Sequence, residues 1–151
     1  MRRGRILATP RDHQTTLSYL RDDLLDRLAR QGFTPSFACG MSCGLRGERD
    51  HLSIPVSNPK GHSLDLTLYI DWTEGTYQVS AHDGSLGPAG FLQSEAHPLD
   101  TATWAEVAKT ALATLRGTRS RYTAAELRQH QAEAQRLRDE ALADWADRWG
   151  P

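Results

Sequence analysis

The stretch that decides the fold is residues 63–82, SLDLTLYIDWTEGTYQVSAH. Apolar side chains alternate with polar ones on both sides of Glu74-Gly75, which is the pattern of two strands that each bury one face. The apolar positions are Leu64, Leu66, Leu68, Ile70, Trp72, Tyr77, Val79 and Ala81. Because Gly75 adopts a positive φ without steric cost, a two-residue turn at this pair predicts a β-hairpin with Ile70 opposite Val79.

Two more alternating stretches precede the hairpin, at residues 37–45 and 51–56. A tight turn between them places Met41 opposite Ile54, and a longer loop after the second places Ile54 opposite Leu66. Every joint then keeps apolar partners on one face of the sheet. This agreement between the turns and the strand patterns predicts a four-stranded antiparallel meander.

A helix is predicted on the N-terminal side of this meander. Residues 10–31 carry leucines at spacings of three and four, which places them on one face of a helix. Thr9 is a good residue to begin this helix, and Gly32 is a good residue to end it. Residues 1–8 form a short basic arm that we expect to be flexible, and we expect residues 9–151 to form a single α+β domain.

Two helices are predicted after the meander, each behind a capping box. The boxes occupy residues 103–106 and 123–126, and the apolar spacing predicts helices over about 104–116 and 124–148. The first of these helices is expected to end before Gly117. We therefore predict an α+β fold with an N-terminal helix, a four-stranded antiparallel β-meander and two C-terminal helices, packed as a two-layer sandwich.

The composition of the chain restricts the class of protein. Hydrophobic residues make up 38% and charged residues 25% of the 151 residues, and the formal net charge is −1. This balance does not fit a protein that binds nucleic acid through bulk positive charge. With two cysteines, no secretory signal and no stretch of roughly 18 apolar residues, the chain is expected to be a soluble cytoplasmic protein without membrane contact.

Cys39 and Cys43 are the first candidates for metal ligands. On an extended strand, residues four apart are separated by roughly 13 Å, which is too far for a shared ion or a disulfide. Both also lie on the apolar side of the predicted strand, where a free cysteine behaves as a small hydrophobe. We therefore expect neither a metal nor a cofactor, and a zinc site is the alternative if Gly40 and Gly44 break the strand into a tight loop.

The polar face of the predicted sheet is the first candidate for a functional surface. The predicted register aligns Ser53, Thr67 and His82 across the strands, with Tyr69 and Ser80 in the neighbouring row. A serine, histidine and carboxylate set on this face would make a small hydrolase-like site centred on His82. However, a flat sheet lacks the concavity that excludes water, and the sequence has no nucleophile elbow, HExxH, P-loop or GxGxxG motif. We therefore favour a face that binds a partner over a catalytic one.

Two further segments are candidates for partner binding. Residues 83–100 are predicted to form a long loop, and loops of this length are often functional. Its Phe91 is expected to pack back onto the domain. Trp145 and Trp149 share one face of the last predicted helix. We expect them to dock on the domain's own helices, with a dimer or partner surface as the alternative.

Nucleic acid is the remaining candidate partner. Arg116, Arg119 and Arg121 cluster at the joint between the last two predicted helices. The order of helix, strands and helix resembles in outline a double-stranded-RNA-binding domain, and this resemblance would imply contact with RNA. The lysine-rich start of that domain's second helix is absent here, and Tyr69 is the only aromatic residue on the predicted polar face.

We therefore expect a non-enzymatic binding or regulatory protein whose partner is a macromolecule, either another protein or a second copy of the chain. Its candidate contact residues are Ser53, Thr67, Tyr69, Ser80, His82, Phe91, Trp145 and Trp149. The first alternative is a nucleic-acid-binding protein that uses Arg116, Arg119, Arg121 and the N-terminal arm. The second alternative is a small hydrolase-like enzyme with the site centred on His82.

Overall fold

The computed structural model of the chain describes residues 13–35, 40–43 and 49–150. The predicted arm over residues 1–8, the helix start at Thr9, and Cys39 lie outside these residues. The first predicted strand is described only over residues 40–43.

The centre of the fold is an antiparallel sheet built on three long strands. These strands are β3 (Arg49–Ser57), β4 (Ser63–Asp71) and β5 (Thr76–His82). The outer edge of β3 pairs with β1 (Thr34–Pro35) and β2 (Gly40–Cys43), and the outer edge of β5 pairs with β6 (Phe91–Gln93) and β7 (His97–Pro98). The sheet is wider than the predicted four-stranded meander because residues 83–100 contribute strands to it.

The registers of the three long strands preserve the predicted faces. Between β3 and β4 the predicted pairing of Ile54 with Leu66 is confirmed. Between β4 and β5 the predicted pairing is wrong by two residues, because Ile70 pairs with Tyr77 and Val79 pairs with Leu68. A shift of two residues leaves every side chain on its own face, so the apolar pattern does not distinguish the two registers.

The side chains around the β4–β5 turn explain the longer connection. Asp71 Oδ1 accepts a hydrogen bond from the backbone N–H of Glu74 at 2.9 Å, which closes the turn. The indole Nε1 of Trp72 donates to Asp50 Oδ2 at 2.6 Å, so this tryptophan bonds to β3 and does not pair with β5. Gly75 has the expected positive φ, at 67°.

The pairing of β2 with β3 also differs from the prediction by two residues. Met41 pairs with Leu52, whereas the sequence pattern places it opposite Ile54. The same period-2 ambiguity accounts for this difference, because both registers keep apolar residues on the same side.

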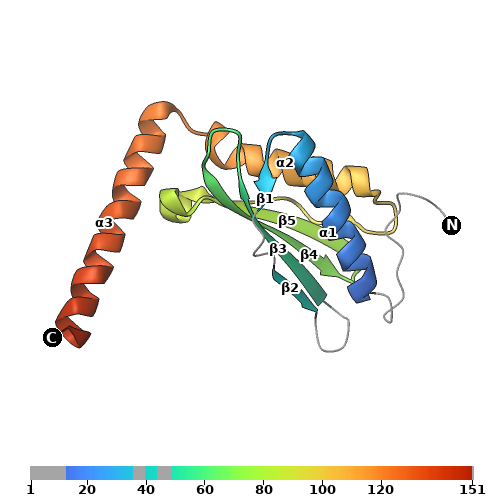
Figure 1. Cartoon of the computed structure of the whole chain (residues 1–151), viewed down its shortest axis with the longest axis horizontal. Helices are drawn as coiled ribbons and strands as arrows, with labels where there is room; N and C mark the ends of the chain where they lie inside the picture. The colour runs from blue at the N-terminus through green and yellow to red at the C-terminus, as the bar shows by residue number, and fades with distance from the viewer. Residues whose placement is uncertain (1–12, 36–39, 44–48, 151) are drawn as a thin grey trace.

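Two helices cover the apolar face of the sheet, as Figure 1 shows: α1 (His13–Arg30) and α2 (Trp104–Ser120). The core between them contains leucines of α1, the alternate apolar residues of β3, β4 and β5, and the inner side of α2. Its largest fully buried members include Leu17, Leu20, Leu24, Leu28, Leu52, Ile54, Leu66, Leu68, Ile70 and Leu115. The predicted α+β class, with the sheet as one layer and helices as the other, is thereby confirmed.

The predicted end of α2 before Gly117 is wrong, because the helix continues to Ser120. A Cβ atom at residue 117 would lie 2.6 Å from Leu92 Cδ2. The glycine therefore serves the close approach of β6 to the helix, and it does not end the helix. Sequence alone does not separate these two uses of glycine.

The last helix, α3 (Ala124–Trp149), begins at the predicted capping box and has the predicted length. Figure 1 shows that it leaves the sandwich and projects away from it, with the C-terminal end far from the sheet. Its first half packs against a 3-10 helix, η2 (Gly84–Gly90), that follows β5. Within the described residues, no helix is long and apolar enough to cross a bilayer.

Candidate functional site

The polar face of the sheet presents hydroxyl and aromatic side chains in two rows. Ser53, Thr67 and Ser80 are direct cross-strand neighbours, so Ser80 occupies the place that the prediction assigned to His82. Ser80 is buried, Ser53 and Thr67 are half-buried, and Tyr69 is exposed beside the ring of His51. A hollow of about 430 Å³ is lined by Tyr69 and His51, and Ser53, Thr67 and Ser80 are not among its lining residues.

His82 lies at the edge of this face and is used by the fold. Its Nε2 lies 3.1 Å from the carbonyl oxygen of Gly87, which can only accept, so Nε2 carries the proton and donates it. Its ring also contacts the ring of Phe91, which pairs with it across β5 and β6. The exposed side chain of Phe91 therefore packs on His82 and not into the core. With Nε2 already bonded, His82 is not arranged as a general base at that atom.

A buried ion pair fixes the segment after β5 to α2. Asp83 Oδ2 accepts a hydrogen bond from Arg119 Nη1 at 2.6 Å, and its Oδ1 accepts from the hydroxyl of Ser85 at 2.6 Å. Burial alone would raise the pKa of Asp83, but the bonds from Ser85 and Arg119 outweigh it and lower the pKa. Asp83 is therefore an ionised, fully bonded anchor for η2.

The other two arginines of the predicted cluster have different partners. Arg121 Nη2 donates to the carbonyl oxygens of Ala89 and Phe91 at 2.7 and 2.8 Å, and Tyr122 donates to Ala89 at 2.8 Å. Arg116 Nη2 donates to Gln31 Oε1 at 3.1 Å and stays exposed. Arg119 and Arg121 thus hold η2 and β6 against the end of α2.

Because η2 is held in this way, it forms a platform for the first half of α3. Ala134 is buried against it, and a Cβ atom at Gly87 would lie 3.3 Å from that of Ala134. One turn further along, Arg138 Nη1 donates to the carbonyl oxygen of Gly84 at 3.3 Å. The platform ends at this contact, and α3 continues for three more turns.

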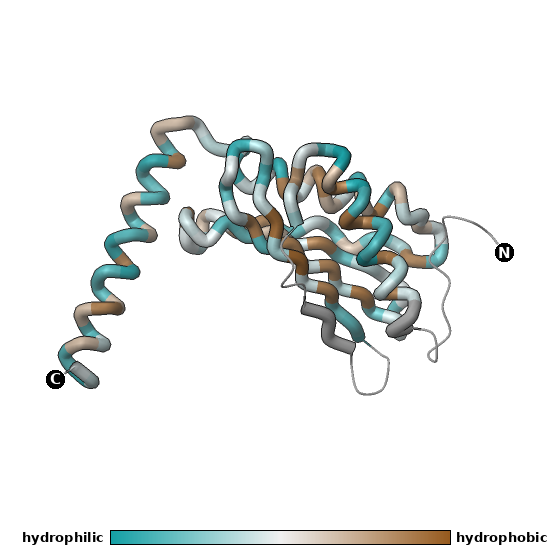
Figure 2. The backbone as a smooth tube through the Cα atoms, viewed as in Figure 1, coloured by the Kyte–Doolittle hydropathy of each residue, from teal (hydrophilic) through white to brown (hydrophobic). Residues whose placement is uncertain are grey.

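The outer part of α3 carries an apolar stripe made of Leu142, Trp145 and Trp149. With Arg138, these residues are spaced by four, three and four positions, so they lie on the side of the helix that faces the platform. Their exposed fractions are 65%, 60% and 74%. Figure 2 shows α3 as a mostly hydrophilic helix with isolated hydrophobic positions along it. The prediction that both tryptophans dock on the domain's own helices is therefore wrong.

Local interactions explain how α3 persists as a helix beyond the platform. Thr123 and Glu126 form both bonds of the capping box, which lower the pKa of Glu126. Arg136 bridges Glu133 and Glu140 on the far side of the helix, and these carboxylates raise its pKa. Such pairs stabilise a helix without tertiary contacts and leave the stripe uncovered.

Sequence reasoning missed several of these residues. Leu142 escaped attention because it lies beside the predicted stripe, although its spacing of three from Trp145 was a usable signal. Asp83 and its partner Arg119 are far apart in the chain, so no local pattern joins them. Among the described residues, no group of three or more His, Cys, Asp or Glu side chains is placed to hold a metal ion.

Comparison of the chain with protein-family models, with curated proteins and with solved structures found no match. A functional assignment therefore rests on the structure of this molecule alone.

Proposed function

We propose that this protein is a non-enzymatic binding protein that engages a protein partner through the apolar stripe of α3. The observation that supports the proposal is the stripe itself, since the same helix face is covered by η2 in its first half and bare in its second half. Soluble proteins rarely expose clustered large apolar groups without an interaction that covers them. Trp is also among the residues most enriched at the energetic centres of interfaces.

The size of the stripe suits a helix that inserts into a groove. Its anchors at i, i+3 and i+7 are the spacing of amphipathic helices bound in apolar grooves. The exposed parts of two tryptophans amount to roughly 300 Å². Burying that area at about 25 cal/mol per Å² contributes roughly 7 kcal/mol before the entropic cost of association.

The alternatives have less support from the contacts. In a nucleic-acid function, Arg119 and Arg121 would have to contact phosphates, yet their guanidinium groups bond to Asp83 and to main-chain carbonyls. In a hydrolase-like function, a ring nitrogen of His82 would have to bond to a nucleophile, yet the bond that its ring makes goes from Nε2 to the carbonyl oxygen of Gly87, and the ring packs on Phe91. Among the described residues, no contact gives Leu142, Trp145 and Trp149 a comparable internal use, and all three are exposed.

A site-specific photocrosslinking experiment tests the proposal. A benzophenone amino acid replaces Leu142 in one version of the full chain and Ala143 in another, and both are irradiated in the native host. The two positions are adjacent and exposed but point to different sides of α3. We expect a discrete protein adduct from position 142 and none from position 143.

Equal adducts from both positions, or none from either, would contradict the proposal. An adduct from position 143 alone would contradict it as well, since that position lies off the stripe.

A further inference from the structure

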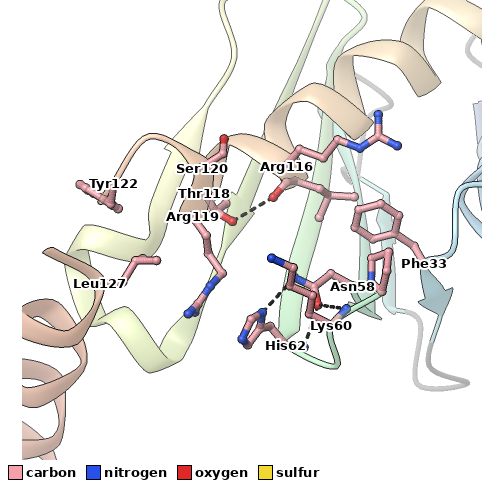
Figure 3. A pocket seen from close by; sticks show the side chains of 12 residues that line it. Phe33, Asn58, Lys60, His62, Arg116, Thr118, Arg119, Ser120, Tyr122 and Leu127 are labelled. Carbon is pink, nitrogen blue, oxygen red and sulfur yellow. Dashed lines mark hydrogen bonds between the residues drawn. The ribbon is translucent and has the colours of Figure 1, made fainter. Parts of the chain in front are cut away.

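A cavity of about 520 Å³ lies between the β3–β4 loop and the C-terminal end of α2 (Figure 3). Its apolar wall is formed by Phe33, Pro59, Leu115, Tyr122 and Leu127. Its basic side chains are Lys60, His62, Arg116 and Arg119. The volume falls within the range of roughly 300–1,000 Å³ that small-molecule sites occupy. The cavity contains none of the residues of the α3 stripe and is therefore independent of the proposed function.

Asn58 holds the β3–β4 loop in one conformation. Its Oδ1 accepts hydrogen bonds from the backbone N–H groups of Lys60 at 3.0 Å and His62 at 2.8 Å. Gly61 completes the turn with a φ of 85°. Lys60 and His62 therefore reach the cavity from an ordered backbone, which reduces the entropic cost of binding a ligand.

The same asparagine determines the tautomer of His62. Asn58 Nδ2 lies 3.1 Å from His62 Nδ1. Because Oδ1 of Asn58 already accepts two backbone bonds, its Nδ2 is the donor, and Nδ1 of His62 is the acceptor. A neutral His62 then carries its proton on Nε2. Figure 3 shows its ring at the same end of the cavity as the guanidinium of Arg119.

The charges around the cavity are unbalanced. No Asp or Glu is found among the described residues that line it. Within the described part of the chain, Lys60 has no ion-pair partner. Arg116 bonds to the neutral amide of Gln31. Arg119 directs Nη1 to Asp83, but a guanidinium has five N–H donors, so others remain. The cavity is therefore positive and rich in donors.

The neighbouring helix end limits the charge of the anion. Thr118 and Ser120 line the cavity from the last turn of α2, where the carbonyl groups give the helix its negative end. Carboxylates and phosphates alike are favoured at the opposite, N-terminal end of a helix, so this end opposes an anion more strongly the greater its charge. A singly charged carboxylate suits this mixture of cations and helix carbonyls better than a phosphate does.

We propose that this cavity binds a small organic acid. Lys60, the Nε2–H of His62 and a remaining N–H of Arg119 hold its carboxylate. The apolar body of the acid lies against Phe33 and Leu127. Binding of this kind needs no metal and no chemical step.

Titration of the isotope-labelled full chain, followed by NMR, tests this proposal. The probes are acetate, phenylacetate and octanoate, with phenylacetamide as the neutral isostere of phenylacetate and inorganic phosphate as the alternative anion. We expect saturable shifts of residues that line the cavity with phenylacetate or octanoate. Affinity is expected to fall about tenfold for phenylacetamide, for acetate and for phosphate.

Two substitutions of exposed lysines provide matched variants. Lys60→Gln removes a cation from the cavity, and Lys109→Gln removes the other lysine of the chain, which lies on α2 outside this cavity. We expect the first to weaken phenylacetate binding about tenfold and the second to leave it unchanged.

Four results would overturn the proposal: no saturable shift with any of the three acids, equal binding of the acid and its amide, tighter binding of phosphate, or unchanged affinity of Lys60→Gln. The amide spectrum of each variant reports directly on its fold.

Discussion

Helices α2 and α3 start in the same way and end in opposite environments. Each begins with a threonine and a glutamate that form a complete capping box. The inner face of α2 is buried, with Val107, Ala111 and Leu115 at most 1% exposed, whereas Trp145 of α3 is mostly exposed. The local signals that begin a helix are therefore equal in the two cases. What differs is the surface that each helix meets, and this difference makes α2 part of the core and the outer α3 a candidate interface.

The same contrast recurs within α3. Up to Arg138 the helix rests on η2, and beyond that residue it has no platform within the described chain. The platform exists because Asp83 and Arg119 tie η2 to α2. The buried ion pair thus holds in place the platform that covers the first half of α3.

Removing Arg119 should have the largest effect, both on the stability of the domain and on the packing of α3 against η2. Arg119→Ala leaves the buried Asp83 carboxylate without its cation, and breaking such a pair costs about 3 kcal/mol. We expect the free energy of unfolding, measured by urea denaturation, to fall by about that amount. Loss of the η2 anchor should also increase amide exchange in the first half of α3.

Arg136→Ala is the matched control, because Arg136 forms its ion pairs on the exposed side of α3. We expect its urea midpoint to stay at the wild-type value. If both variants behaved alike, the Asp83–Arg119 pair would not be the anchor that separates the two halves of α3.

Removing the tryptophans should affect binding without affecting the core. Trp145→Ala with Trp149→Ala deletes exposed side chains, so the urea midpoint should remain within experimental error of wild type. Capture of the crosslinked partner should weaken by about 2 kcal/mol or more, roughly thirtyfold, if either tryptophan is an interface anchor. Pull-down with purified partner, quantified over a concentration series, measures the change.

A double variant on the far side of the same helix separates this effect from a general loss of helix. Ala132 and Ala143 lie away from the stripe, and both are exposed. Ala132→Ser with Ala143→Ser should leave capture unchanged. If this variant lost as much partner capture as the tryptophan variant, partner binding would depend on the helix as a whole and not on the side chains of the stripe.

The sequence pattern predicted the layers of this fold because its signals are local. Alternation over residues 63–82 identified two strands, and the capping boxes identified the starts of α2 and α3. The pattern failed where two arrangements share the same local signal. A shift of two residues in the pairing leaves every side chain on the same face of the sheet. The register of Ile70 therefore depends on the hydrogen bonds of Asp71 and Trp72, which a period-2 pattern does not predict.

The candidate site was predictable only in part, for a related reason. The sequence identified Trp145 and Trp149 as one face of a helix, but whether a face is covered depends on where the helix points. That direction follows from η2, which was predicted as part of an irregular loop. The cavity at Lys60 and His62 was missed altogether, because it joins the β3–β4 loop to α2 across a long stretch of chain.

Removing the N-cap of each helix tests most directly whether α2 and α3 differ in their coupling to the core, and its expected effect on stability is the smallest. Thr103→Ala and Thr123→Ala each remove one capping box, at a cost of about 1 kcal/mol to the helix concerned. Because α2 is part of the core, Thr103→Ala should lower the global free energy of unfolding by about that amount.

For Thr123→Ala we expect a smaller change in the global free energy of unfolding, since α3 packs on η2 outside the core cluster and can open while the sandwich stays folded. The cost should appear instead as faster amide exchange confined to α3. Hydrogen exchange measured by mass spectrometry on both variants distinguishes the two patterns. Equal global destabilisation by the two substitutions would show that α3 unfolds only together with the core. In that case a partner would meet a helix that the whole domain keeps rigid, and mobility of α3 would have no part in binding.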